Sequence, residues 1–225
     1  TLLSIPNVAY DLPNINKNAD HIITELKKRN VETKLLRMVG TPPIIYGYYP
    51  VKGAKRTLAF YVHYDGQPVD KSKWTNDPWK PVYYTEAIFN DGQQIDFPTE
   101  MSEVNENHRI YARSAGDDKA PIITILSALD MIQANKLDVT SNLVFFFEGQ
   151  EEAGSDQLQQ YLNDHRELVD EIDLWMFCDG PVHQSRRPQL VFGVRGVTGM
   201  EITTYGPNRP LHSGHYGNWA PVTGQ

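Results

Sequence analysis

Three apolar segments are each followed by side chains that can bind a metal ion or transfer a proton. Residues 57–62 lead to His63 and Asp65, and residues 142–147 lead to the loop with Glu151 and Glu152. Residues 173–178 lead to Asp179. A fourth segment, 109–114, leads to Asp117 and Asp118 where a helix is expected to begin. One imidazole and several carboxylates offer nitrogen and oxygen ligands, which suit a divalent metal ion. If the strand ends converge, they form a metal centre.

The number of carboxylates indicates what such a centre would hold. Several carboxylates in a partly desolvated crevice must either take up protons or bind a cation. Nitrogen and oxygen ligands without thiolate favour zinc, with manganese or cobalt as alternatives. The carboxylates outnumber the ligands that one tetrahedral zinc ion needs, so a site with two metal ions is the simplest interpretation. In such sites the ions lie about 3.5 to 4 Å apart.

Hydrophobic patterning predicts the elements that position these residues. Segments 57–62, 142–147 and 173–178 are nearly continuous apolar runs, which is typical of strands buried on both faces. Helices are expected at 16–29, from the pair Asp117 and Asp118 onward, and at 156–168, and an exposed strand is expected at 197–207. Strands that alternate with helices indicate an α/β domain, in which ligands bind at the carboxyl ends of the strands.

Each motif also has an interpretation without function. A His-x-Asp sequence is common by chance. Acidic residues before a helix are by default caps or a solvated first turn, and Asp179 can simply open a turn with the Gly-Pro pair that follows it. Individually the motifs are weak, and it is their joint occurrence at strand ends that favours a metal centre.

Composition limits the classes of partner. The chain has 225 residues, 28 acidic against 21 basic, and a net charge of -7, which argues against nucleic acid or an anionic membrane as a partner. No apolar run approaches the roughly 18 to 20 residues that span a bilayer. The single cysteine, Cys178, cannot form an internal disulfide. We expect a cytoplasmic protein, although a chain beginning at Thr1 leaves a processed leader, and thus a secreted or periplasmic location, open.

Five ordered motifs carry a resemblance to a known family. The segments "HYDGQPVD", "ARSAGDDKAP", "FFFEGQEEAGS", "FCDGP" and "RPLHSGHYG" resemble the M20 family of metallopeptidases, and within it the dipeptidase branch that includes carnosine dipeptidase and the cytosolic nonspecific dipeptidase. The match spans about 57–217. One departure is Ala120, where the family usually has Gly.

The resemblance implies a role for each motif residue. The implied ligands of two zinc ions are His63 and Asp179 on the first, Glu152 on the second, and Asp117 bridging both, with a cis peptide between Asp117 and Asp118. The resemblance further implies that Glu151 is the general base and that Asp65 orients His63 by contacting the second nitrogen of the imidazole ring. It also implies that His212 reaches from the partner subunit of a homodimer to polarise the scissile carbonyl.

The resemblance also implies an architecture. Residues 1–195 would form the N-terminal part of a three-layer, zinc-exopeptidase-like catalytic domain with a mixed, largely parallel sheet. Residues 196–225 would begin an inserted α+β lid and dimerisation domain. The family supplies a further histidine ligand and contacts to the substrate's carboxylate from downstream of these motifs. We therefore expect residues 1–225 alone to be poorly active or inactive.

The implied activity is zinc-dependent hydrolysis of dipeptides or short peptides, in which Glu151 takes a proton from a metal-bridged water. An N-acyl amino-acid deacylase or an acetylornithine deacetylase-like amidohydrolase would share the same metal residues. A noncatalytic metal-binding module is the alternative from another class. Glu151 argues against it, because a structural zinc site has no need of a free base.

Overall fold

The structure is a computed structural model that describes residues 2–99, 102, 105–180 and 182–216. The chain divides into two units, 1–181 and 182–225. Each unit is described by itself. None of the described helices combines the length and the apolar character needed to cross a bilayer.

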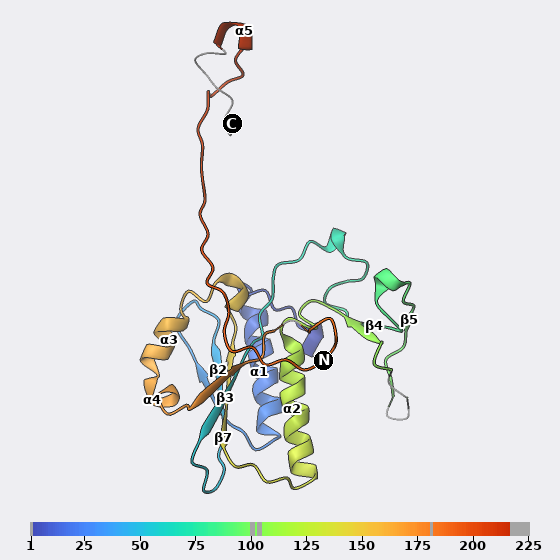
Figure 1. The fold of residues 1–225 in the computed structure, drawn as a ribbon, viewed down its shortest axis with the longest axis vertical. Coiled ribbons are helices and arrows are strands. Elements are labelled where there is room, and N and C mark those ends of the chain that lie inside the picture. The colour runs from blue at the N-terminus through green and yellow to red at the C-terminus, as the bar shows by residue number, and fades with distance from the viewer. Residues whose placement is uncertain (1, 100–101, 103–104, 181, 217–225) are drawn as a thin grey trace. The chain divides into compact units, whose positions relative to one another are not determined.

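A mixed five-stranded sheet forms the centre of the first unit (Figure 1). Its order is β1 (Glu32–Leu36), β2 (Ile44–Tyr49), β7 (Asn142–Glu148), β3 (Thr57–His63) and β8 (Leu174–Phe177). The β1–β2 and β2–β7 pairs are antiparallel, whereas β7–β3 and β3–β8 are parallel. The strands expected at 57–62 and 142–147 are confirmed, and the structure shows that they are neighbours in a partly parallel sheet.

Helices cover both faces of this sheet (Figure 1). On one face lie α1 (Leu12–Lys27) and α2 (Lys119–Ala134), and on the other lie α3 (Leu158–Asp164) and α4 (Arg166–Val169). Successive side chains of a strand point to opposite faces. Phe145 and Phe147 accordingly join the core beneath α1 and α2, while Phe146 joins a second core with Tyr161 of α3. The result is a three-layer α/β arrangement.

Two helices differ from their expected bounds. The first begins at Leu12 rather than at residue 16, because the Asp11 side chain caps it by accepting from the backbone N–H of Asn14, and proline is tolerated in the first turn. The helix expected at 156–168 is divided into α3 and α4. His165 leaves the helical conformation between them, with φ −129° and ψ 36°.

One strand prediction was wrong in part, and another predicted strand lies in a separate sheet. β8 was expected to be buried, but Leu174 is 53% exposed and Phe177 is 69% exposed. Among the described residues β8 is an edge strand, with β3 as its sole partner. The strand before Asp117, β6 (Arg109–Tyr111), does not belong to the main sheet. It pairs with β4 (Val82–Tyr84) in a separate antiparallel sheet that also contains β5 (Gln94–Ile95).

Short 3-10 helices complete the first unit: η1 (Leu2–Ser4), η2 (Lys71–Lys73), η3 (Ile88–Asn90) and η4 (Glu151–Ala153). In the second unit, the regular element within the described residues is α5 (Ser213–Tyr216). The exposed strand expected at 197–207 is not found, since no described residue pairs with that segment. A domain boundary near residue 195 and a lid domain beyond it stay predictions.

Gly149, directly after β7, lies where no side chain fits. A Cβ at this position would lie 2.6 Å from the hydroxyl oxygen of Tyr64 and 2.7 Å from its Cζ. Tyr64 is fully buried and donates to the carbonyl oxygen of Pro43 at 2.5 Å, so its ring cannot move freely.

We predict that Gly149→Ala lowers the free energy of unfolding by about 1–3 kcal/mol through overpacking. Gly116→Ala is the matched control, because a Cβ there has no atom within 4 Å. Denaturant unfolding followed by circular dichroism measures both. Equal stability of the two variants would contradict the close packing described for Gly149.

Candidate metal centre

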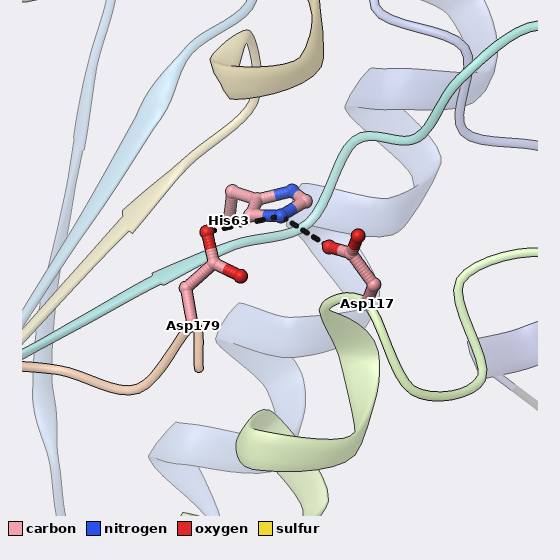
Figure 2. Close-up of side chains that lie close together, drawn as sticks. All are labelled: His63, Asp117 and Asp179. Carbon is pink, nitrogen blue, oxygen red and sulfur yellow. Dashed lines mark hydrogen bonds and ion pairs between the residues drawn. The ribbon is translucent and has the colours of Figure 1, made fainter. Parts of the chain in front are cut away.

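Three of the predicted site residues lie together at one edge of the main sheet. His63 ends β3, and Asp179 follows β8, which runs parallel to β3. Asp117 comes from the turn before α2. Because parallel strands end at the same edge of a sheet, residues far apart in the sequence meet there. Figure 2 shows the three side chains pointing toward one another.

The distances within this group suit a shared cation. Nε2 of His63 lies 2.8 Å from Oδ1 of Asp117 and 3.7 Å from Oδ2 of Asp179. The potential ligand atoms of the three residues all lie within 4.8 Å of one another. The His63 side chain is buried, whereas the Asp117 side chain is 71% exposed, so the group can be reached from solvent. The peptide between Asp117 and Asp118 is cis, as expected from the resemblance.

Asp65 joins His63 to the acidic loop that follows β7. It is fully buried, and its Oδ1 lies 3.4 Å from Nδ1 of His63. Its two carboxylate oxygens also accept from the backbone N–H groups of Glu151 and Glu152, each at 3.0 Å. Asp65 thus contacts the ring that it is predicted to orient, and the role itself stays a prediction. The contacts with the loop were not predicted, because backbone donors leave no signature in a sequence.

Glu151 and Glu152 have different surroundings. Oε2 of Glu151 lies 3.9 Å from Nε2 of His63. Burial raises the pKa of Glu151 despite the opposing effect of His63, and the charges of Asp179, Glu152 and Asp65 raise it further. A raised pKa suits a group that must accept a proton. The carboxylate of Glu152 instead accepts from Nε2 of Gln67 at 2.9 Å and is not part of the three-residue group.

The electrostatics of the centre favour a bound positive charge. Burial alone would lower the pKa of His63, but the hydrogen bond and charge of Asp65, together with the charges of Asp118 and Asp179, raise it to about 10. Burial also raises the pKa of Asp118, which accepts from the backbone N–H of His63, to about 7. A divalent cation can replace the retained proton as the partner of these carboxylates. The donor set therefore fits a metal ion.

His212, the remaining predicted site residue, lies in the second unit. Its Nδ1 accepts from the backbone N–H of Gly214 at 3.0 Å, and its ring is exposed. The roles assigned to the seven site residues from the sequence stay predictions.

Two further polar residues near the centre were missed. Gln67 holds Glu152, and nothing in its spacing distinguishes it from a turn residue. Glu148, the last residue of β7, is buried and accepts from the Tyr61 hydroxyl at 2.5 Å. A carboxylate that ends an apolar strand was a signal that could have identified Glu148.

Comparisons with known proteins find sequences that are similar to this chain. Residues 59–215 match the sequence profile of peptidase family M20/M25/M40. The chain is 30% identical over 229 residues to a Cys-Gly metallodipeptidase of Schizosaccharomyces pombe, covering 96% of this chain and 44% of the relative. It is 26% identical over 178 residues to human Beta-Ala-His dipeptidase, covering 78% of this chain and 31% of the relative.

A solved structure shows the same fold. The M20 family metallo-carboxypeptidase Sso-CP2 of Sulfolobus solfataricus has a TM-score of 0.65 and 27% identity, with 84% of this chain and 38% of that one covered. The chain thus spans less than half the length of each of these three relatives.

We predict that zinc binding at about pH 8 releases protons, and that His63 is one source. The imidazole has a pKa of about 10 without metal, so below that pH it must lose a proton to bind zinc through Nε2. The apparent affinity for zinc should consequently rise with pH between about 7 and 10, by up to about tenfold per unit. Calorimetry in two buffers of different ionisation enthalpy counts the protons.

Asp65→Asn provides the control for this prediction. It removes the largest influence that raises the pKa of His63, so fewer protons should be released at the same pH. Zinc binding without proton release in the unmodified protein would contradict the prediction.

Proposed function

Because this chain belongs to peptidase family M20/M25/M40, we propose that the protein is a metal-dependent peptidase that hydrolyses dipeptides or short peptides. The observation that carries this proposal is the meeting of His63, Asp117 and Asp179 within 4.8 Å at the carboxyl edge of the sheet. Two named relatives support the substrate class, since one is a Cys-Gly metallodipeptidase and the other a Beta-Ala-His dipeptidase.

The proposed ligands are His63, Asp117, Glu152 and Asp179, and the proposed metal is a pair of zinc ions, with manganese or cobalt as alternatives. When bound, such ions lower the pKa of a water molecule and polarise a carbonyl group. His63 would bind through Nε2, because Asp65 occupies the side of the ring that carries Nδ1. Asp65 would fix the ring and, through the two loop amides, hold Glu151 and Glu152 beside it.

Glu151 is the proposed general base. Its side chain is 38% exposed and lies beside His63, so a water and a peptide carbonyl can both approach it. Burial raises its pKa, so Glu151 can take the proton from the attacking water and pass it to the leaving amine. His212 is proposed to stabilise the carbonyl oxygen from the partner subunit of a homodimer. That assembly and a cytoplasmic location stay predictions.

We predict that Glu151→Gln lowers kcat by about 10² to 10⁴-fold, because an amide cannot take up the proton, while zinc binding stays near the wild-type level. Dipeptide hydrolysis and metal content measured on the same sample of the whole protein test this. Glu171→Gln is the matched control, because Glu171 is an exposed glutamate outside the site, and it should leave both quantities unchanged. Undiminished turnover in Glu151→Gln would show that another group is the base.

Substrate specificity separates the proposal from the related amidohydrolases. We expect dipeptides to be turned over faster than N-acetyl amino acids, with both rates abolished by a chelator. Preference for N-acetyl amino acids would instead indicate a deacylase. In the whole protein, metal binding without turnover of either class would indicate the noncatalytic module.

A further inference from the structure

The segment before α1 lies against both loops that carry the metal-binding candidates. Its first turn, η1, is held by Lys119, which is almost fully buried. Nζ of Lys119 donates to the carbonyl oxygens of Leu2 at 3.0 Å and Ile5 at 3.1 Å. Lys119 is the first residue of α2, so the segment is tied to the helix that begins beside Asp117.

Asn7 is the residue of this segment that joins the two loops. Its Nδ2 donates to the carbonyl oxygen of Tyr64 at 2.7 Å and to Oγ of Ser114 at 3.0 Å. Its own carbonyl oxygen accepts from the backbone N–H of Gly66 at 2.9 Å. Asn7 is fully buried, so these hydrogen bonds are protected from exchange with water. One side chain therefore bridges the loop after β3 and the turn before α2.

The residues around Asn7 are closely packed. A Cβ on Gly66 would lie 2.3 Å from Oγ of Ser114 and 3.2 Å from both polar atoms of the Asn7 side chain. Ser114 itself is in the left-handed region, with φ 59°, and its carbonyl oxygen accepts from the backbone N–H of Lys119 at 3.1 Å. The three residues Asn7, Gly66 and Ser114 thus interlock between the loops.

The two loops need such a connection, because His63 and Asp117 are 54 residues apart in sequence but must face one cation. Direct links between the loops are also present: Nε2 of His63 lies 2.8 Å from Oδ1 of Asp117, a contact that a bound metal ion would replace, and the backbone N–H of His63 donates to Oδ2 of Asp118 at a long 3.3 Å. Asn7 adds two hydrogen bonds on the buried side of the centre.

We propose that Asn7 is a positioning residue for the metal centre: it sets the separation of the loops that carry His63 and Asp117, and thereby the affinity for the metal. This inference rests on the proposed function, because it assumes that these residues bind a metal ion. Asn7 itself does not touch the metal or the substrate. Partners that orient ligands typically change metal affinity by about 10 to 100-fold when they are removed.

A matched asparagine separates positioning from general stability. Asn142, at the opposite end of β7, also joins two segments: its Oδ1 accepts from the backbone N–H of Val51 at 2.9 Å, and its Nδ2 donates to Oγ1 of Thr57 at 3.4 Å. Truncating Asn142 removes similar bonds from the sheet without touching either loop.

The test measures zinc affinity by competition with a chromophoric chelator, and the visible spectrum of the cobalt-loaded protein, in the full chain. Measurements are made at a temperature where circular dichroism shows every variant folded. We expect Asn7→Ala to weaken zinc binding about tenfold and to alter the cobalt spectrum, and Asn142→Ala to change neither. Asn7→Asp should behave like Asn7→Ala, because it turns the donor toward Tyr64 into an acceptor, and it serves in place of Asn7→Ala if that variant does not fold.

Each other outcome overturns the inference. Wild-type affinity and spectrum in the Asn7 variants would show that the loops hold their separation without Asn7. An equal loss in Asn142→Ala would show that the effect is one of stability. If the unmodified protein itself binds neither zinc nor cobalt, the proposed function fails together with the inference. Loss of binding in the Asn7 variants alone leaves the proposed function intact, so the two failures are distinguishable.

Discussion

The buried carboxylate of Asp65 holds the candidate centre together. A buried charge is costly unless it is fully paired and hydrogen-bonded. Asp65 meets this requirement with the His63 ring on one side and the amides of Glu151 and Glu152 on the other. The same contacts aim the imidazole, place the two glutamates, and leave the remaining carboxylates facing one another. Pairing Asp65 in this way builds a site in which Asp117, Asp179 and Glu151 share the one imidazole of His63 until a metal ion binds.

The pairing of strands in the main sheet brings His63 and the loop with Glu151 together. His63 and Glu148 are paired in the parallel register of β3 and β7, so the loop with Glu151 begins beside His63. A shift of the register by one residue would turn His63 to the other face of the sheet and separate it from the loop. Phe145 and Phe147 pack in the core beneath α1 and α2, whereas Phe146 packs in the second core, so such a shift would exchange side chains between two cores and disrupt the packing of both. Packing in the core thus keeps His63 beside the loop with Glu151.

Local sequence patterns predicted the strands that carry the site but not the long-range hydrogen bonds that join its loops. The runs at 57–62 and 142–147 were recognisable because a strand buried on both faces has few polar residues. β8 has the same texture, yet Phe177 is exposed, since burial also depends on what lies beside a strand. His63, Asp117 and Asp179 were found because each lies at the end of a regular element or within two residues of one. Asn7 was not, because its two side-chain contacts lie 57 and 107 residues away and an isolated asparagine has many uses.

The central claim is that His63, Asp117 and Asp179 bind a metal ion at the carboxyl edge of the sheet. Anomalous diffraction at the zinc absorption edge, from crystals of the zinc-loaded protein, tests it most directly. The account predicts an anomalous peak in contact with Nε2 of His63 and with carboxylate oxygens of Asp117 and Asp179. Zinc bound elsewhere, or held by the sulfur of Cys178, would contradict it.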